Sequence, residues 1–172
     1  MIPARPHDVC PSIDSARIIL AIKNFAKVPG VCHIGLGVTA ANTLKVLRRA
    51  GFHAEAWPCD SPNGKGNEIK VLRAKLEAVA KSGGRPVTHV IISAPSWIQP
   101  PDFSSLAFDY PDTTFVQLNH SGAAYLSIDK YGIRNIREVA ALSQTTHNIR
   151  VAANNERAAS EAVRADAYGF VS

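Results

Sequence analysis

The sequence predicts an α/β fold: a Rossmann-like, doubly wound parallel sheet of about five strands with helices on both faces. Short runs rich in β-branched residues alternate with longer segments whose apolar residues recur at helical spacing. A glycine turn, Gly35-Leu36-Gly37, separates one such run from a helical segment, as in the first unit of a doubly wound sheet. The length of 172 residues is enough for a core of this kind, so residues 1–172 are interpreted as a single domain.

Apolar segments between turn signals are expected to form the strands. The organising segment is residues 31–34, a buried strand that leads through the glycine turn into a helix from Thr39 to about Ala50. The other predicted strands are residues 53–57, 87–92, 113–118 and 149–153. Because crossovers between parallel strands are right-handed, these strands are expected in the order 3-2-1-4-5.

Further helices are expected before, between and after these strands. The first would run from Ser12 to about Ala26, because Ile18, Ala21, Ile22 and Phe25 would share one face. The others are predicted at residues 68–81, 103–110, 121–128, 133–143 and 155–168. Residues 1–11 contain Pro3, Pro6 and Pro11 and are expected to form an irregular arm.

The carboxyl ends of the strands should share one edge of the sheet, where ligands of open α/β sheets bind. The glycine turn and the free N–H groups at the start of the following helix suit a phosphate or carboxylate. The alternative is a glycine turn needed only to pack the helix on the strand. The residues expected to bind substrate or phosphate at this edge are Gly35, Leu36, Gly37, Val38, Thr39, Trp57, Ser93, Trp97, Asn119, Ser121 and Asn154.

His120 is the candidate catalytic residue. It follows one predicted strand and precedes a helix, so it should face the glycine turn across the crevice. A neutral imidazole there can accept or donate a proton, or hydrogen-bond a sugar hydroxyl. Alternatively, His120 bonds a neighbouring backbone group and only shapes the turn.

Composition excludes several classes of protein. Cys10, Cys32 and Cys59 fit neither a zinc pattern nor a disulfide framework, which favours a reducing cytoplasm. No apolar run reaches the length of a membrane span, and no secretory signal is evident. The net charge of +5 favours anionic ligands or peripheral contact with an anionic membrane, with a solvated surface as the alternative. The basic residues lack the interleaved aromatics typical of nucleic-acid binding.

An oxidoreductase domain that binds a nicotinamide dinucleotide is the first alternative function. Ala40 supplies the third small residue that such a motif needs after its glycines. However, Trp57 and Pro58 stand where an acidic residue should meet the ribose, so no cofactor is expected. Neither a Walker motif nor a nucleophile elbow is present.

Several segments, taken in order, carry a family resemblance. They are Gly35-Leu-Gly-Val-Thr-Ala-Ala-Asn42, Leu47-Arg-Arg-Ala-Gly51, Glu55-Ala-Trp-Pro58, Thr88-His-Val-Ile-Ile-Ser-Ala-Pro95, residues 115–121 and Val151-Ala-Ala-Asn-Asn155. Together they resemble the N-terminal domains of GT-B-type glycosyltransferases, over about residues 31–169. The order and spacing of the segments carry this resemblance, since no single motif is diagnostic.

The resemblance implies an acceptor-side domain that works with a nucleotide-sugar donor and an acceptor. In this family two Rossmann-like domains face each other across a cleft, and the C-terminal domain holds the donor. By this likeness Gly35 and Gly37 would approach the donor diphosphate, and His120 would lie near the donor sugar. The family's C-terminal domain is absent from residues 1–172, so this chain alone is expected to be inactive in sugar transfer. A non-catalytic domain that binds a small anion or a partner is a further alternative.

Overall fold

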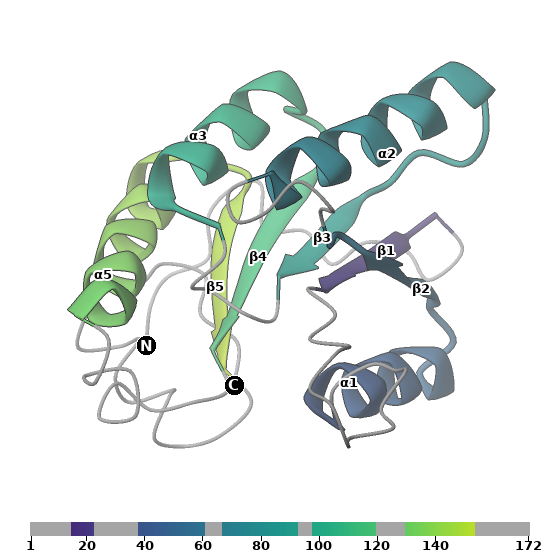
Figure 1. The fold of residues 1–172 in the computed structure, drawn as a ribbon. Coiled ribbons are helices and arrows are strands. Elements are labelled where there is room, and N and C mark those ends of the chain that lie inside the picture. The colour runs from purple at the N-terminus through teal and green to yellow at the C-terminus, as the bar shows by residue number, and fades with distance from the viewer. Residues whose placement is uncertain (1–14, 23–37, 61–66, 93–97, 120–129, 154–172) are drawn as a thin grey trace.

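The computed structural model describes residues 15–22, 38–60, 67–92, 98–119 and 130–153, in which strands and helices alternate (Figure 1). This alternation confirms the predicted α/β class. In chain order the elements are β1 (Arg17–Ile22), α1 (Val38–Arg49), β2 (His53–Pro58), α2 (Glu68–Ser82), β3 (His89–Ile92), α3 (Pro100–Asp109), β4 (Thr114–Asn119), α5 (Lys130–Thr145) and β5 (Ile149–Ala153).

The strands form one sheet in which every neighbouring pair is parallel. The order is β2-β1-β3-β4-β5, so the predicted order 3-2-1-4-5 is wrong. The segment 87–92 was expected beyond β2, but β3 instead pairs with β1 on one side and β4 on the other. The reason is that α1 and α2 pack on opposite faces of the sheet. Because crossovers are right-handed, the connection from β2 through α2 carries the chain back past β1, and β3 joins the sheet on the other side of β1.

Residues 17–22 form the strand β1, which corrects the helix predicted at 12–26. Ile19 and Ala21 belong to the core on one face of the sheet, and Leu20 belongs to the core on the other. A short, continuously apolar run fits a helix with one buried face as well as a strand that is buried on both faces. The spacing of its residues therefore cannot distinguish the helix from the strand. The predicted strand 31–34 and the glycine turn lie outside the described residues.

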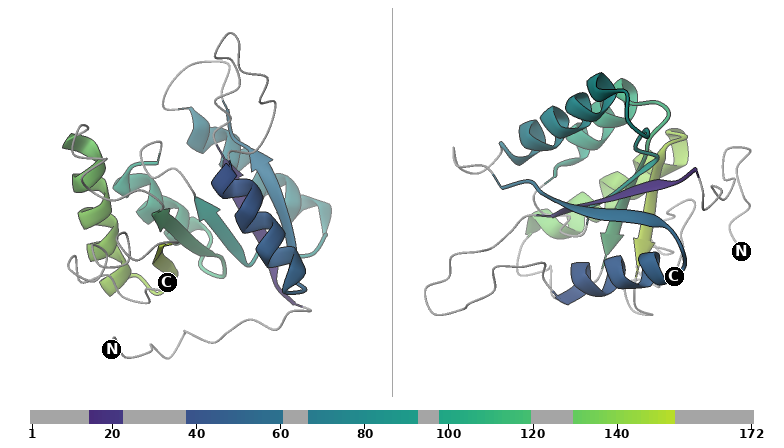
Figure 2. Two further views of the ribbon diagram at one scale, coloured as in Figure 1. Left: turned by 90° about the horizontal axis from the view of Figure 1, so that it is seen from below. Right: turned by 90° about the vertical axis from the view of Figure 1, so that its right-hand side faces the viewer.

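Helices cover both faces of the sheet (Figures 1 and 2). On one face α1 contributes Leu44 and Leu47 to a core with β1 and β2. On the other face α2, α3 and α5 enclose the larger core, whose fully buried members include Leu72, Phe103 and Phe115. The doubly wound arrangement predicted from the sequence is therefore present, and it brings the carboxyl ends of all five strands to one edge.

The described helices lie close to their predicted positions. The helix predicted from Thr39 begins at Val38, and the one predicted to stop before Gly83 does so, with Gly83 in the left-handed conformation at φ 68°. α3 begins earlier than predicted, at Pro100, because proline suits the first helical position. The side chain of Asp102 accepts a hydrogen bond from the backbone N–H of Gln99 at 3.4 Å, which supports this start. The helices predicted at 121–128 and 155–168 lie outside the described residues.

Candidate functional site

The chain changes from one face of the sheet to the other between β1 and β3. These strands are neighbours, yet the chain leaves β1 towards α1 on one face and leaves β3 towards α3 on the other. Divergence of this kind opens a crevice beyond the strand ends, and it is where ligands of doubly wound sheets bind. The sequence predicted the switch point between its first and fourth strands, and the observed strand order places it between β1 and β3.

The structure describes four of the predicted site residues. Val38 and Thr39 are the first residues of α1, Trp57 is in β2, and Asn119 ends β4. The remaining predicted site residues, which lie outside the described part of the chain, are Gly35, Leu36, Gly37, Ser93, Trp97, His120, Ser121 and Asn154.

The expected pairing of the glycine turn with His120 falls on two segments that lie outside the described residues, so it stays a prediction. Among the described strands, β3 separates β1 from β4.

Trp57 is part of the packing of the sheet. It pairs in register with Ala21 of β1, and its half-buried ring packs against the core on the α2 face. Trp57 is among the residues expected to bind substrate or phosphate at the carboxyl edge. The structure shows that this ring also closes the core at the end of β2.

Cys59 lies beside the carboxyl edge as a buried free thiol. Its backbone N–H donates to the carbonyl of Ile22 at 2.8 Å, and its Sγ lies 3.4 Å from the carbonyl oxygen of Trp57. Burial raises the pKa of the Cys59 thiol to about 12, and the nearby Lys75 only partly opposes this effect. The thiol is therefore protonated at neutral pH, which makes it a poor nucleophile and metal ligand.

Alkylation should show how strongly Cys59 is protected. At pH 8 we expect iodoacetamide to modify Cys59 in the native chain about two to three orders of magnitude more slowly than in urea, because the thiolate is scarce when the pKa is near 12. Peptide mapping by mass spectrometry distinguishes Cys59 from Cys10 and Cys32. Native and unfolded rates within tenfold of each other would contradict the buried placement.

Gln117 is a buried polar residue two positions before the end of β4, and it was not among the predicted site residues. It is fully buried in β4, two residues after Phe115, and pairs in register with Ile92 and Val151. An amide there can orient neighbouring backbone or a ligand by hydrogen bonding. The available signal was the single amide within the apolar run of residues 115–118.

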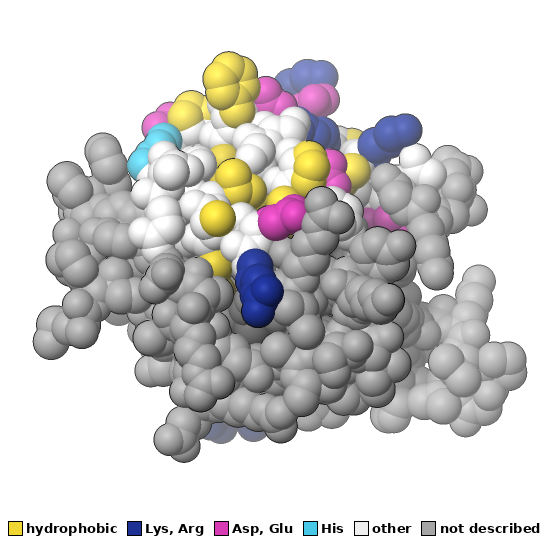
Figure 3. All heavy atoms as spheres, turned by 90° about the vertical axis from the view of Figure 1, so that its left-hand side faces the viewer, with side chains coloured by type: hydrophobic (Ala, Val, Ile, Leu, Met, Phe, Trp, Pro, Cys, Tyr) yellow, Lys and Arg dark blue, Asp and Glu magenta, His cyan; other side chains and the backbone are white. Residues whose placement is uncertain are grey.

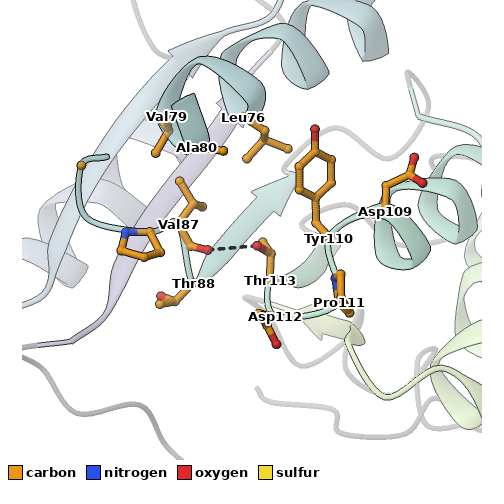
Figure 4. Close-up of a pocket in the computed structure, with 12 residues that line it drawn as sticks. Leu76, Val79, Ala80, Val87, Thr88, Asp109, Tyr110, Pro111, Asp112 and Thr113 are labelled. Carbon is orange, nitrogen blue, oxygen red and sulfur yellow. Dashed lines mark hydrogen bonds between the residues drawn. The ribbon is translucent and has the colours of Figure 1, made fainter. Parts of the chain in front are cut away.

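A cavity of about 570 Å³ lies at the opposite edge of the sheet (Figure 4). Its walls come from the end of α2, the segment before β3 and the turn between α3 and β4. The lining residues are Leu76, Val79, Ala80, Gly84, Pro86, Val87, Thr88, Asp109, Tyr110, Pro111, Asp112 and Thr113. None of the residues predicted for the carboxyl edge lines this cavity.

The described residues contain no group of three or more His, Cys, Asp or Glu side chains placed to hold a metal ion. Among the helices that the structure describes, none is both long enough and apolar enough to cross a membrane.

Comparison with known proteins identified no relative: no protein-family model, no curated protein and no solved structure matches this chain. The assignment of function therefore rests on the fold and on the residues themselves.

Proposed function

We propose that this chain is the acceptor-side half of a GT-B-type glycosyltransferase and that its ligand occupies the carboxyl edge beyond β1 and β3. The observation that supports the proposal is the switch of the chain between the two faces at these neighbouring strands, which is where doubly wound sheets bind their ligands. The resemblance of residues 31–169 to such domains supplies the substrate class, a nucleotide-sugar donor and a separate acceptor.

The amino end of α1 supports an anionic ligand at this edge. α1 begins at Val38, directly after the sequence of the glycine turn, and its first turn contains no acidic residue. The unpaired N–H groups and the dipole of a helix start favour a phosphate there. A diphosphate bound at this end of α1 would lie on the same edge of the sheet as the carboxyl ends of β3 and β4.

The oxidoreductase alternative has less support. β2 ends in Trp57 and Pro58, so that strand end offers no carboxylate for a ribose hydroxyl. An anion-binding domain without catalytic activity uses the same edge, and ligand titration distinguishes it from a transferase.

Gly37→Val tests this site. We expect the wild-type chain to bind a uridine or guanosine diphosphate sugar and the variant to bind it at least about tenfold more weakly, because a side chain would occupy the space where the backbone approaches the diphosphate. Isothermal titration calorimetry gives the affinities, and urea unfolding shows whether both chains fold. Gly84→Val is the matched control at the opposite edge, where an added Cβ would meet only the Ser82 side chain at 3.3 Å.

The same titrations distinguish the alternatives. Binding of NAD(H) without binding of nucleotide sugars would identify an oxidoreductase domain, and binding of inorganic pyrophosphate alone would identify an anion-binding domain. If Gly37→Val destabilises the fold, His120→Ala replaces it as the test of ligand affinity. Sugar transfer by residues 1–172 alone would contradict the half-enzyme proposal and would make His120 the centre of a self-contained site.

A further inference from the structure

The cavity at the amino edge of the sheet has the composition of a small-molecule site. Its volume of about 570 Å³ lies within the range of ligand pockets, and most of its lining is apolar. Figure 4 shows Leu76, Val79 and Ala80 of α2 facing the wall that contains Tyr110, with Val87 and Thr113 between them. This arrangement forms a slot for a flat or branched apolar group.

The floor of the slot is fixed by hydrogen bonds that leave little polar surface inside. The Thr113 hydroxyl donates to the carbonyl of Val87 at 3.0 Å, which ties the turn after α3 to the segment before β3. The Thr88 hydroxyl accepts from the backbone N–H of Arg17 at 2.9 Å and donates to the Arg17 carbonyl at 3.1 Å. These hydroxyls are therefore committed to the fold, and an apolar body meets no unsatisfied hydroxyl from either residue.

The charge of the slot is negative. Its charged lining residues are Asp109 and Asp112, and no Lys, Arg or His is found among the described lining residues. Arg73 neutralises Asp109 through an ion pair of 2.6 Å. Asp112 is exposed and makes no ion pair or hydrogen bond with another described residue. One carboxylate at the rim therefore remains available to a ligand.

Tyr110 adds a second feature that favours a cation. Burial is the main cause that raises the pKa of its phenol, and the negative charge of Glu77 is the next. The positive charge of Arg73 lowers this pKa, and the negative charge of Asp109 raises it by a smaller amount. The ring is therefore neutral at physiological pH. The face of a neutral aromatic ring attracts an ammonium group within about 6 Å.

We propose that this cavity is a second ligand site that binds an amphipathic amine, with its aromatic or branched apolar body in the slot and its ammonium group beside Asp112 and Tyr110. The site is independent of the function proposed for the carboxyl edge, because the two lie at opposite ends of the strands. The same negative charge disfavours a nucleotide or another phosphate ligand here.

A second copy of the chain fits the slot less well. Phe108 is the exposed aromatic residue that could enter it, since its side chain is 85% exposed. Phe108 is followed by Asp109, so insertion would bring this carboxylate and its neighbours towards Asp112. Figure 3 shows hydrophobic and acidic side chains side by side on the described part of one face. Because Arg73 neutralises Asp109, the docked copy would bring no net positive charge to Asp112, in contrast to an ammonium group.

Three ligands with one indole body provide the test: tryptamine, its alcohol analogue tryptophol, and indole-3-propionate. We expect calorimetry or protein-observed NMR to give saturable binding of tryptamine about three- to tenfold tighter than that of tryptophol, with the carboxylate weakest. Asp112→Asn should remove most of the preference for tryptamine over tryptophol. Asp60→Asn, an exposed carboxylate beyond β2, is the control and should retain the preference.

Ala80→Phe tests whether the slot itself is occupied. Ala80 lines the cavity from the exposed side of α2, so a phenyl ring there should weaken tryptamine binding at least tenfold without disturbing the core. Ala78→Phe is the matched control, because Ala78 is also an exposed alanine of α2 but does not line the cavity. This variant should bind tryptamine as tightly as the unsubstituted chain. Equal affinity for the three indoles, unchanged binding by Ala80→Phe, absence of saturable binding, or a concentration-dependent dimer that Ala80→Phe dissociates would each overturn the proposal.

Discussion

Replacement of Asn148 with alanine is expected to lower the free energy of unfolding by about 2–4 kcal/mol. The side chain is buried, and its Nδ2 lies 3.0 Å from the carbonyl oxygen of Ala107, 3.1 Å from that of Tyr110 and 3.0 Å from that of Thr113. Alanine would remove this donor from all three carbonyls, of which that of Tyr110 still accepts from the backbone N–H of Thr113 at 3.1 Å. The expected loss of stability is smaller than that of three full hydrogen bonds, because Nδ2 has only two hydrogens. In addition, the buried Oδ1 has no hydrogen-bond partner among the described residues, so its removal offsets part of the cost.

Two further variants show that hydrogen-bond donation is the cause. Asn148→Asp keeps the size of the side chain but presents acceptors to three carbonyl oxygens, so it should destabilise the chain at least as much as alanine does. Gln144→Ala, at an exposed position of α5, should change stability by less than about 0.5 kcal/mol. Urea unfolding followed by circular dichroism measures each value. An Asn148→Ala chain as stable as the Gln144→Ala chain would show that the three contacts contribute little.

The second large effect is expected in β1, at Ile19 and Leu20. Both side chains are fully buried, but they belong to cores on opposite faces of the sheet. Truncation of either to alanine removes apolar contacts and leaves a cavity, so each variant should lose about 2–5 kcal/mol. A chain of ordinary stability would then be close to unfolding at room temperature.

This pair of variants also distinguishes a strand from a surface helix. A helix that buried Ile18, Ala21 and Ile22 would leave Leu20 towards solvent, and Leu20→Ala would then be nearly neutral. Val46→Ala in α1, where the side chain is 65% exposed, is the control and should change stability by less than about 0.5 kcal/mol. If only one of the two β1 variants is destabilised, residues 17–22 are not buried on both faces.

Local patterns were sufficient to predict the fold class and most of the elements. The strands β2, β3, β4 and β5 are where the turn signals and β-branched runs placed them, and Gly83 ends α2 as expected. β1 was missed because its apolar residues are consecutive, so they match helical spacing as well as a strand covered on both faces. The strand order depends on which face each helix covers, which is a property of tertiary packing that the local pattern does not contain.

The candidate sites were predictable to a lesser degree. The carboxyl edge follows from the fold class alone, although the position of its switch point follows from the strand order. Gln117 and Asn148 were missed because the role of a buried amide depends on neighbours distant in sequence. The amino-edge cavity joins residues near 80 to residues near 110 and consists mostly of ordinary core residues, so no motif marks it.

The position of β2 and β5 at the two sides of the described sheet has a consequence for self-association. Each has one row of backbone groups facing away from its partner strand, which is a template for a strand from another chain. β2 contains His53 and Glu55 and ends in Pro58, which has no N–H to donate, and β5 contains Arg150. Charge and proline on these borders oppose the addition of further strands, which helps to keep the sheet from growing into aggregates at high concentration.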